Sequence, residues 1–189
     1  MTTGAKWTLA VLALAALAFA SLGAGMAGRT SQAGPVRQDA ARDAMFYLAA
    51  LRGEALGLRG PGDPFHSRLT RAAFSQAGRG YVYGGAGPSG FDCSGFTSWS
   101  YAQAGHALPR TSGEQFRQGR AVDPKALRQG DLVFFGREGR VDHVGIYLAD
   151  GRFIHSSRPA GGVAVSSLAD PYWTRTYAGA RRPDAGGAP

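Results

Sequence analysis

The 189-residue sequence has only one cysteine, Cys93, and only 13 acidic residues against 21 lysines and arginines. A single thiol cannot form a disulfide within the chain, and it excludes structural zinc sites that need two or more cysteines. Repeats with a period of roughly 20–50 residues are also absent, which sets solenoid architectures aside. With 44% hydrophobic and 11% aromatic residues, the chain can still supply the core of one modest domain.

Charge is missing altogether from residues 7–28. Lys6 precedes this stretch, and an A-x-A sequence at 18–20 follows its most apolar part, which is the pattern of a secretory signal peptide. The uncharged stretch is also long enough to span a bilayer as an uncleaved anchor. We therefore expect residues 1–27 to be a signal peptide or an N-terminal membrane anchor. The remainder is then exported to the periplasm, the cell envelope or the medium.

The shortage of acidic side chains gives the chain a net charge of +8 at pH 7. On an exported protein, a basic surface favours an anionic polymer or a lipid surface as the partner, although a soluble protein that is merely basic has the same composition. The arginines are scattered and no nucleic-acid-binding motif accompanies them, so we expect no nucleic acid as a partner.

Beyond the N-terminal segment we predict a linker with a helix (28–64), a folded domain (65–183) and a disordered tail (184–189). Within the domain, helices come first and an antiparallel sheet follows, which defines an α+β fold. Asp150-Gly151 is a strong signal for a two-residue hairpin turn between two strands. The predicted helices span 37–52, 65–77 and 93–104, and the predicted strands span 131–136, 142–149, 152–157, 162–168 and 176–182.

Cys93 stands at the predicted start of a helix, among Gly90, Asp92 and Ser94. Three roles are open to it. A buried thiol serves as a small hydrophobic residue, but polar and glycine neighbours are not typical of a core. A zinc ligand is chemically possible together with two histidines, although the spacing matches no common zinc motif. The third role is that of a nucleophile, because the partial positive charge of a helix N-terminus stabilises a thiolate.

Four histidines are candidates to assist this thiol. His143 and His155 lie on successive predicted strands, where both can border one surface, whereas we expect His66 and His106 to be surface or capping residues. In a nucleophilic site one histidine takes the thiol proton, giving a thiolate–imidazolium pair, and a third polar group orients that histidine. Cys93, His143 and His155 can fill these three roles in that order.

Four blocks of sequence together resemble the NlpC/P60 family of cysteine peptidases, in order and in spacing. They are YVYGGAGPSGFDCSGF (81–96), LPRTSGEQ (108–115), GDLVFF (130–135) and DHVGIYLADGRFIHSS (142–157). The resemblance implies a papain-like fold with the cysteine on a helix that packs against an antiparallel sheet. It also implies cleavage of peptidoglycan stem peptides, typically between γ-D-glutamate and a diamino acid, with no metal and no organic cofactor.

By this resemblance Cys93 is the nucleophile, His143 is the general base and acid, and His155 is the orienting residue. Tyr81 matches a tyrosine associated with the oxyanion site, where its phenol would donate beside backbone N–H groups of the helix start. Packing in the core is the alternative role for Tyr81. Tyr83 stands where many members of the family carry tryptophan.

Asp92 and Ser112 match positions that hold the peptide part of the substrate. The Asp92 carboxylate suits a substrate ammonium, and it suits a helix cap equally well. Beside Cys93 it would raise the pKa of the thiol, so it must point away or be paired. We expect Arg110 and Gln115, in the same block as Ser112, to be structural.

The sequence therefore predicts an exported, monomeric, single-domain cysteine endopeptidase whose partner is peptidoglycan or its stem peptides. Three alternatives stay open. They are a non-catalytic wall-binding protein, an antibacterial toxin with the same chemistry, and an amidase or acyltransferase, because related folds host such reactions.

Overall fold

A computed structural model describes residues 64–87 and 89–183 of the chain. The predicted signal peptide or anchor (1–27), the helix expected at 37–52 and the tail (184–189) lie outside these residues. Within the described part, no helix is long and apolar enough to cross a membrane.

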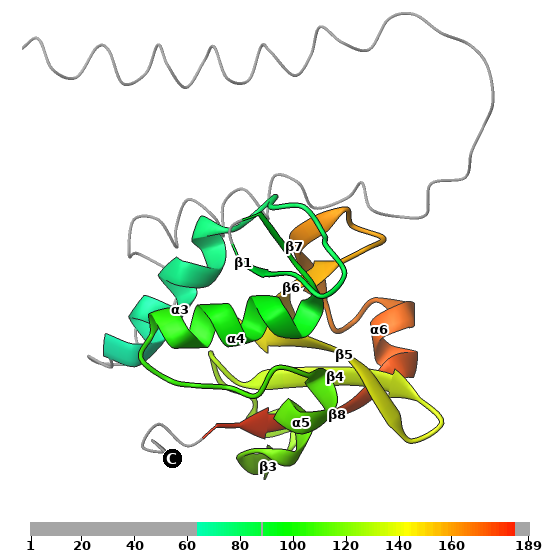
Figure 1. Cartoon of the computed structure of the whole chain (residues 1–189). Coiled ribbons are helices and arrows are strands. Elements are labelled where there is room, and N and C mark those ends of the chain that lie inside the picture. Colours follow the sequence, from blue (N-terminus) through cyan, green and yellow to red (C-terminus); the bar gives the residue numbers. More distant parts are fainter. Residues whose placement is uncertain (1–63, 88, 184–189) are drawn as a thin grey trace, which may run out of the picture. The chain divides into compact units, whose positions relative to one another are not determined.

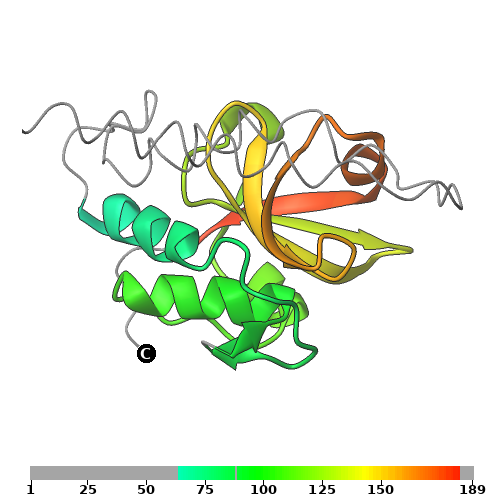
Figure 2. The ribbon, with the colours of Figure 1, turned by 90° about the horizontal axis from the view of Figure 1, so that it is seen from above.

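A six-stranded antiparallel sheet lies against two helices, α3 (Pro64–Ser75) and α4 (Cys93–Gln103) (Figure 1). Figure 2 shows both helices on one side of the sheet. The predicted α+β fold is therefore confirmed. The strands follow the order β3-β8-β4-β5-β6-β7. Their bounds are β3 (Arg120–Val122), β4 (Leu132–Arg137), β5 (Arg140–Tyr147), β6 (Arg152–Ser157), β7 (Gly162–Ser167) and β8 (Tyr177–Arg182).

Both helices predicted within the domain are present, and α4 ends just before Gly105 as expected. The backbone of Gly105 has a φ of 87°, which glycine adopts readily after a helix. The helical spacing places Phe96 and Trp99 on one face, with Gln103 as a further candidate for that face. In the structure Phe96 and Tyr101 are buried and Trp99 is half-buried, whereas Gln103 is exposed. The spacing did not single out Tyr101, which packs into the core shared by the helices and the sheet.

The glycine-rich segment 78–91 connects the two helices and is fastened to β7 by backbone hydrogen bonds. The N–H of Gly78 donates to the carbonyl of Val163 at 2.8 Å, and the N–H of Tyr81 donates to the carbonyl of Gly161 at 3.0 Å. The segment thus has a fixed position between β7 and α4. It also contains two short paired strands that the sequence does not predict, β1 (Ala86–Gly87) and β2 (Gly90–Phe91).

The five strands predicted in the C-terminal half are confirmed as β4 to β8, with ends displaced by at most two residues. The predicted turn is confirmed as well, since Asp150 and Gly151 both have positive φ, 51° and 72°, as a tight hairpin requires. The sequence does not predict β3, which pairs with β8 and not with its neighbours in the chain. Three short helices are also unpredicted: α5 (Ser112–Arg117), a 3₁₀ helix (Pro124–Ala126) and α6 (Pro171–Thr176).

Strand β4 is buried on both faces, which explains its unbroken apolar run. Leu132 and Phe134 belong to the core that the sheet shares with the helices. Val133 and Phe135 point to the opposite face, into a second cluster against which Trp173 of α6 packs. The helices therefore cover one face of the sheet, and α6 with its aromatic side chains covers part of the other.

A buried ion pair ties the last strand to the start of β4. Nε of Arg182 is 2.6 Å from one carboxylate oxygen of Asp131, and the second oxygen accepts from another guanidinium nitrogen at 2.7 Å. The backbone N–H of Arg128 donates to the same carboxylate at 2.7 Å. Since both oxygens have partners, the cost of burying the charge is offset.

Gly95, in the first turn of α4, lets the helix approach segment 78–91 closely. A Cβ at this position would lie 2.0 Å from the carbonyl oxygen of Gly85 and 3.0 Å from Cα of Ala86. Alanine normally favours a helix over glycine by about 1 kcal/mol. Here we expect Gly95→Ala to lower the free energy of unfolding by about 1–3 kcal/mol, because backbone atoms must move. Urea denaturation measures this change.

Gly113→Ala in α5 is the matched control, because the nearest heavy atom to its Cβ would be the end of the Arg117 side chain at 4.0 Å. This variant should be as stable as the parent or slightly more stable. Equal free energies of unfolding for both variants would show that segment 78–91 moves away from the new Cβ without loss of stability. That result would contradict the close packing described above.

Candidate active site

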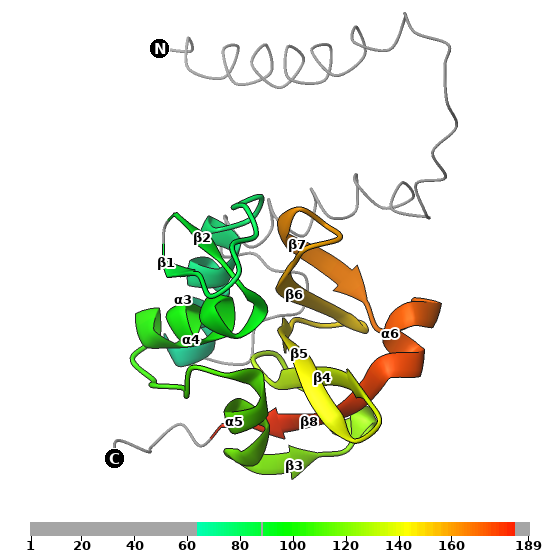
Figure 3. The ribbon, with the colours of Figure 1, turned by 45° about the vertical axis from the view of Figure 1, so that its right-hand side comes forward.

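Cys93 is the first residue of α4 and lies half-buried against strand β5. Its Sγ is 3.9 Å from the carbonyl oxygen of Asp142. Burial and the charge of Asp92 raise the pKa of the thiol, and a hydrogen bond from the backbone N–H of Val144 partly offsets them. Asp142 and Val144 flank His143, so the thiol lies next to this histidine along the strand. Figure 3 shows α4 beside β5 and β6, the two strands that carry the histidines.

The two histidines form a hydrogen-bonded chain that continues to a serine. Nε2 of His143 is 2.7 Å from Nδ1 of His155, and Nε2 of His155 is 2.9 Å from Oγ of Ser166. The three residues lie on the adjacent strands β5, β6 and β7. When each ring donates from Nε2, Nδ1 of His143 keeps its lone pair and is the nitrogen left for the thiol. Sequence reasoning missed Ser166, because a serine on a strand is too common to single out.

Aromatic side chains enclose the histidine pair. Trp173 stacks on His143 with ring centroids 5.2 Å apart and meets His155 edge-on at 5.0 Å, while Phe135 and Phe153 pack beside them. Burial therefore lowers the pKa of His143 to about 4. Burial and the neighbouring His143 lower the pKa of His155 well below 6.5. Sequence reasoning missed Trp173 too, although the Asp-Pro pair before it is a typical helix start.

The resting site favours a neutral thiol and a neutral imidazole. The pKa of Cys93 is raised and that of His143 is lowered, so the proton stays on sulfur. Both shifts work against a thiolate–imidazolium pair in the absence of substrate. The physical reason is the dry surroundings of both groups, which disfavour either charge.

Asp92 caps α4 and is paired with an arginine from the segment after that helix. One of its oxygens accepts from the backbone N–H of Gly95 at 2.6 Å. Arg110 donates to both oxygens, at 3.1 and 2.7 Å, and also to Oγ of Ser94 at 3.1 Å. The condition set by the sequence, that a carboxylate beside Cys93 must point away or be paired, is thus met by pairing. Arg110 accordingly has an electrostatic role beyond the structural one expected of it.

Gln115 is fully buried and holds the segment after α4 against that helix. Its Nε2 donates to the carbonyls of Ser94 at 3.1 Å and Pro109 at 2.8 Å, and its Oε1 accepts from Thr97 at 2.8 Å. The structural role expected of Gln115 is confirmed. Ser112 is buried at the start of α5, and among the described residues no hydrogen bond joins its side chain to the thiol or the histidines.

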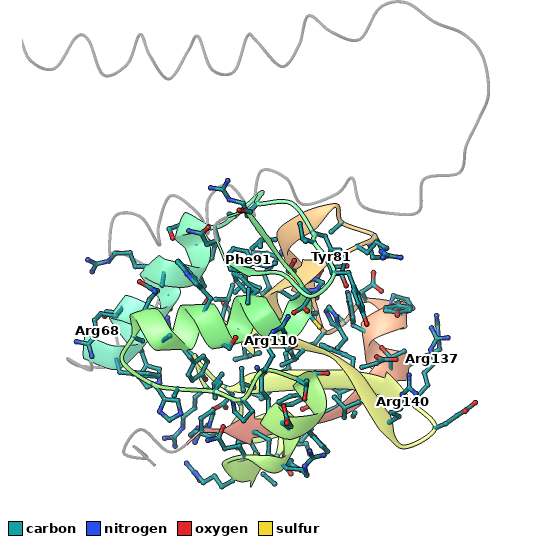
Figure 4. All side chains as sticks on the ribbon, in the orientation of Figure 1. Arg68, Tyr81, Phe91, Arg110, Arg137 and Arg140 are labelled. Carbon is teal, nitrogen blue, oxygen red and sulfur yellow. The ribbon has the colours of Figure 1, made fainter. Side chains whose placement is uncertain are left out.

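Tyr81 borders the site from the glycine-rich segment. Its backbone bridges to that of Phe91, two residues before Cys93 (Figure 4). Burial raises the pKa of the half-buried phenol, and electrostatic interactions with Cys93 and Asp92 raise it further. The phenol therefore lies within electrostatic reach of the thiol. Tyr83, by contrast, is 85% exposed and points into solvent.

The other two histidines pack beside aromatic rings. His66 is half-buried next to Phe65, and His106 is buried against Phe65 and Tyr101. A surface position was therefore wrong for His106, whereas the alternative of a capping residue is confirmed, because its backbone N–H donates to the carbonyl of Tyr101 at 2.9 Å and closes the end of α4. In residues 64–87 and 89–183, no cluster of three or more histidine, cysteine or acidic side chains is arranged to hold a metal ion.

The fold and the site together define the class: an α+β domain that presents a helix-terminal cysteine beside two hydrogen-bonded histidines. The sequence profile of the NlpC/P60 family matches residues 78–182, more than half of the chain, so the chain belongs to the NlpC/P60 family. One relative is γ-D-glutamyl-L-lysine dipeptidyl-peptidase of Bacillus cereus, 46% identical over 105 residues. Another is murein DD-endopeptidase MepH of Escherichia coli, 42% identical over 113 residues. These matches cover 54% and 57% of this chain but only 32% and 42% of those proteins.

Solved structures of this family share the fold. An NlpC/P60 family protein of Bacillus cereus matches with a TM-score of 0.60 and 41% identity, over 62% of this chain and 39% of that one. The NlpC/p60 domain of the peptidoglycan hydrolase SagA matches with a TM-score of 0.55 and 34% identity, over 62% of this chain and 97% of that one. RipD of Mycobacterium tuberculosis matches with a TM-score of 0.55 and 29% identity, over 64% of this chain and 98% of that one. It is described as a non-catalytic NlpC/p60 domain protein adapted to peptidoglycan binding. The predicted family and fold are confirmed.

The Asp92–Arg110 pair generates a prediction about the thiol. We expect Arg110→Ala to raise the pKa of Cys93 further, because Asp92 would face the sulfur without its counter-charge. Alkylation by iodoacetamide, followed as a function of pH, measures this pKa. The rate near neutral pH should fall by about three- to tenfold.

Arg117→Ala, an exposed arginine in the last turn of α5, serves as the control and should leave the alkylation profile unchanged. An unchanged or lowered thiol pKa in Arg110→Ala would show that Asp92 does not act on the sulfur.

Proposed function

We propose that this chain is an exported cysteine endopeptidase that hydrolyses peptidoglycan stem peptides at the bond between γ-D-glutamate and a diamino acid. Family membership supports the reaction class. The observation that carries the proposal is the position of the Cys93 thiol against the backbone beside His143, together with the 2.7 Å contact between Nε2 of His143 and Nδ1 of His155. The name of the Bacillus cereus relative supports the γ-D-glutamyl bond, whereas that of MepH denotes a D,D bond. The test must therefore identify the bond that is cut.

Cys93 is the proposed nucleophile and His143 the proposed general base and acid. As Sγ attacks the scissile carbonyl carbon, the thiol proton passes to Nδ1 of His143 and a sulfur–carbon bond forms. The tetrahedral intermediate collapses with cleavage of the carbon–nitrogen bond, and His143 returns the proton to the leaving amine. Water then attacks the thioester, giving its proton to His143, and the carboxylate product and the thiol are released.

The negatively charged oxygen of the tetrahedral intermediate requires hydrogen-bond donors near the N-terminus of α4, which begins at Cys93. The backbone N–H groups of Cys93 and Ser94 already point toward the sulfur, where they counter the rise in pKa caused by burial and Asp92. The first N–H groups of a helix have no partner within it and suit a developing negative charge. Tyr81 is the proposed third donor, because its phenol remains protonated with a raised pKa.

His155 is the proposed orienting residue, and Ser166 and Trp173 support it. Donation from His143 to His155 and on to Ser166 holds the tautomer in which Nδ1 of His143 is basic. The stacked ring of Trp173 holds the plane of His143. These contacts keep the base in place while its charge changes.

Asp92 and Ser112 are the proposed contacts to the peptide part of the substrate. Oδ2 of Asp92 accepts one hydrogen bond, from Arg110, so this oxygen keeps a lone pair for a substrate ammonium. Ser112 begins α5 and is 9% exposed, so little of its side chain is accessible before a substrate binds.

A non-catalytic wall-binding role is the second candidate, because the chain resembles RipD in fold. Three described features favour catalysis instead. The thiol is intact, the imidazole chain is complete, and the geometry leaves Nδ1 of His143 for proton transfer.

Digestion of purified peptidoglycan is the direct test of the reaction. The full chain should release fragments that end in γ-D-glutamate or begin with the diamino acid, identified by mass spectrometry. Cys93→Ala should release none, because the thioester cannot form. A matching thermal transition for both proteins controls for folding. Unchanged stem peptides in both digests, with both proteins folded, would overturn the proposal in favour of a binding role.

The pH dependence of kcat/KM tests the neutral resting pair. His143 must be unprotonated to accept the thiol proton, and burial lowers its pKa to about 4. Activity should therefore be retained through the range in which an ordinary imidazole, with its pKa of 6.5, becomes protonated, and should fall only as the pH drops through about 4. Circular dichroism over the same range confirms that the fold persists. An acid limb centred near 6.5 would contradict a desolvated base.

A further inference from the structure

Arg158 opens the turn between β6 and β7 and stands over a residue of the site. Its guanidinium carbon is 5.7 Å from the ring centroid of Tyr81. The backbone fixes both partners: the N–H of Gly161 donates to the carbonyl of Arg158 at 3.0 Å, and the N–H of Tyr81 donates to the carbonyl of Gly161 at 3.0 Å. The position of the arginine relative to the tyrosine is therefore built into the fold.

Arg158 forms no ion pair with an acidic residue among residues 64–87 and 89–183, unlike Arg110, which pairs with Asp92, and Arg182, which pairs with Asp131. Its side chain is exposed, and its one charge-related contact is with the face of Tyr81. A cation–π contact at an exposed site is weak, about 0.5–1 kcal/mol. It orients the guanidinium without neutralising it.

Tyr81 links this free cation to the reacting thiol. The pKa of the tyrosine is raised first by burial and then by Cys93 and Asp92, and it is lowered by Arg158. The backbone of Tyr81 also bridges to that of Phe91, two residues before Cys93, while the guanidinium of Arg158 stands over its ring. A group bound by Arg158 would be a neighbour of the atoms that react.

We propose that Arg158 binds the α-carboxylate of the γ-linked glutamate in the substrate. The proposal rests on the proposed function. In a γ-glutamyl amide the side-chain carboxyl forms the scissile bond, so the α-carboxyl group stays free and ionised a few bonds from the reacting carbon. The planar guanidinium matches a carboxylate with two parallel hydrogen bonds, which gives orientation as well as attraction. This carboxylate is present whichever diamino acid follows.

Two synthetic stem peptides test the proposal with the full chain. One carries γ-linked D-glutamate, and the other carries D-isoglutamine, in which the α-carboxylate is replaced by a neutral amide. The parent should prefer the D-glutamate peptide. Arg158→Gln should raise KM for that peptide by about tenfold or more, in the range of a charge-assisted hydrogen bond, while cleavage of the D-isoglutamine peptide should stay nearly unchanged. The KM of Arg158→Lys for the D-glutamate peptide should lie between those of the parent and of Arg158→Gln, because lysine keeps the charge but loses the paired donors.

Arg120→Gln is the matched control, since Arg120 is an exposed arginine on β3, at the other edge of the sheet from β7. It should leave both peptides unaffected. If Arg158→Gln loses activity equally on both peptides, or on neither, the carboxylate assignment is overturned while the peptidase function stands. If the parent cleaves neither peptide, the proposed function fails and this assignment fails with it.

Discussion

The hydrogen bond between His143 and His155 is the contact on which the site depends. It forms only because β5 and β6 pair in a register that places both rings on the face shared with Phe135 and Phe153. The tight turn at Asp150-Gly151 sets that register, and a slip of one residue would send every side chain to the opposite face. The position of the base is therefore a property of the whole hairpin.

The second constraint is that both histidines are electrically neutral, and it follows from the close contact between their rings. Two imidazoles at hydrogen-bond distance in an aromatic enclosure cannot both carry charge, and burial holds each in its neutral form. The one acidic group at the helix start, Asp92, is matched by Arg110. In the proposed mechanism, charge separation then occurs only when the substrate carbonyl accepts the sulfur and the helix N–H groups receive the negative charge.

Local signals in the sequence were sufficient for most of the fold. The turn residues, the apolar strands and the polar start of α4 predicted five strands, two helices and the placement of Cys93. The family resemblance added the roles of the two histidines. Contacts between distant segments were beyond such reasoning: Trp173 reaches His143 from a short helix thirty positions away, and β3 is recognisable as a strand only through its pairing with β8. The burial of His106 was not foreseen, because helical spacing does not say which neighbours the residues after a helix will meet.

The place of β8 in the sheet has a consequence for how the protein comes into being. Residues 177–182 are among the last of the domain to be synthesised, yet they lie between β3 and β4 and supply Arg182 to the buried Asp131. Until they arrive, β4 has an open edge and an uncompensated acidic group at its start. A nascent chain emerging from the ribosome therefore cannot complete this domain early. The six-stranded sheet is therefore complete only when the final strand lies between β3 and β4.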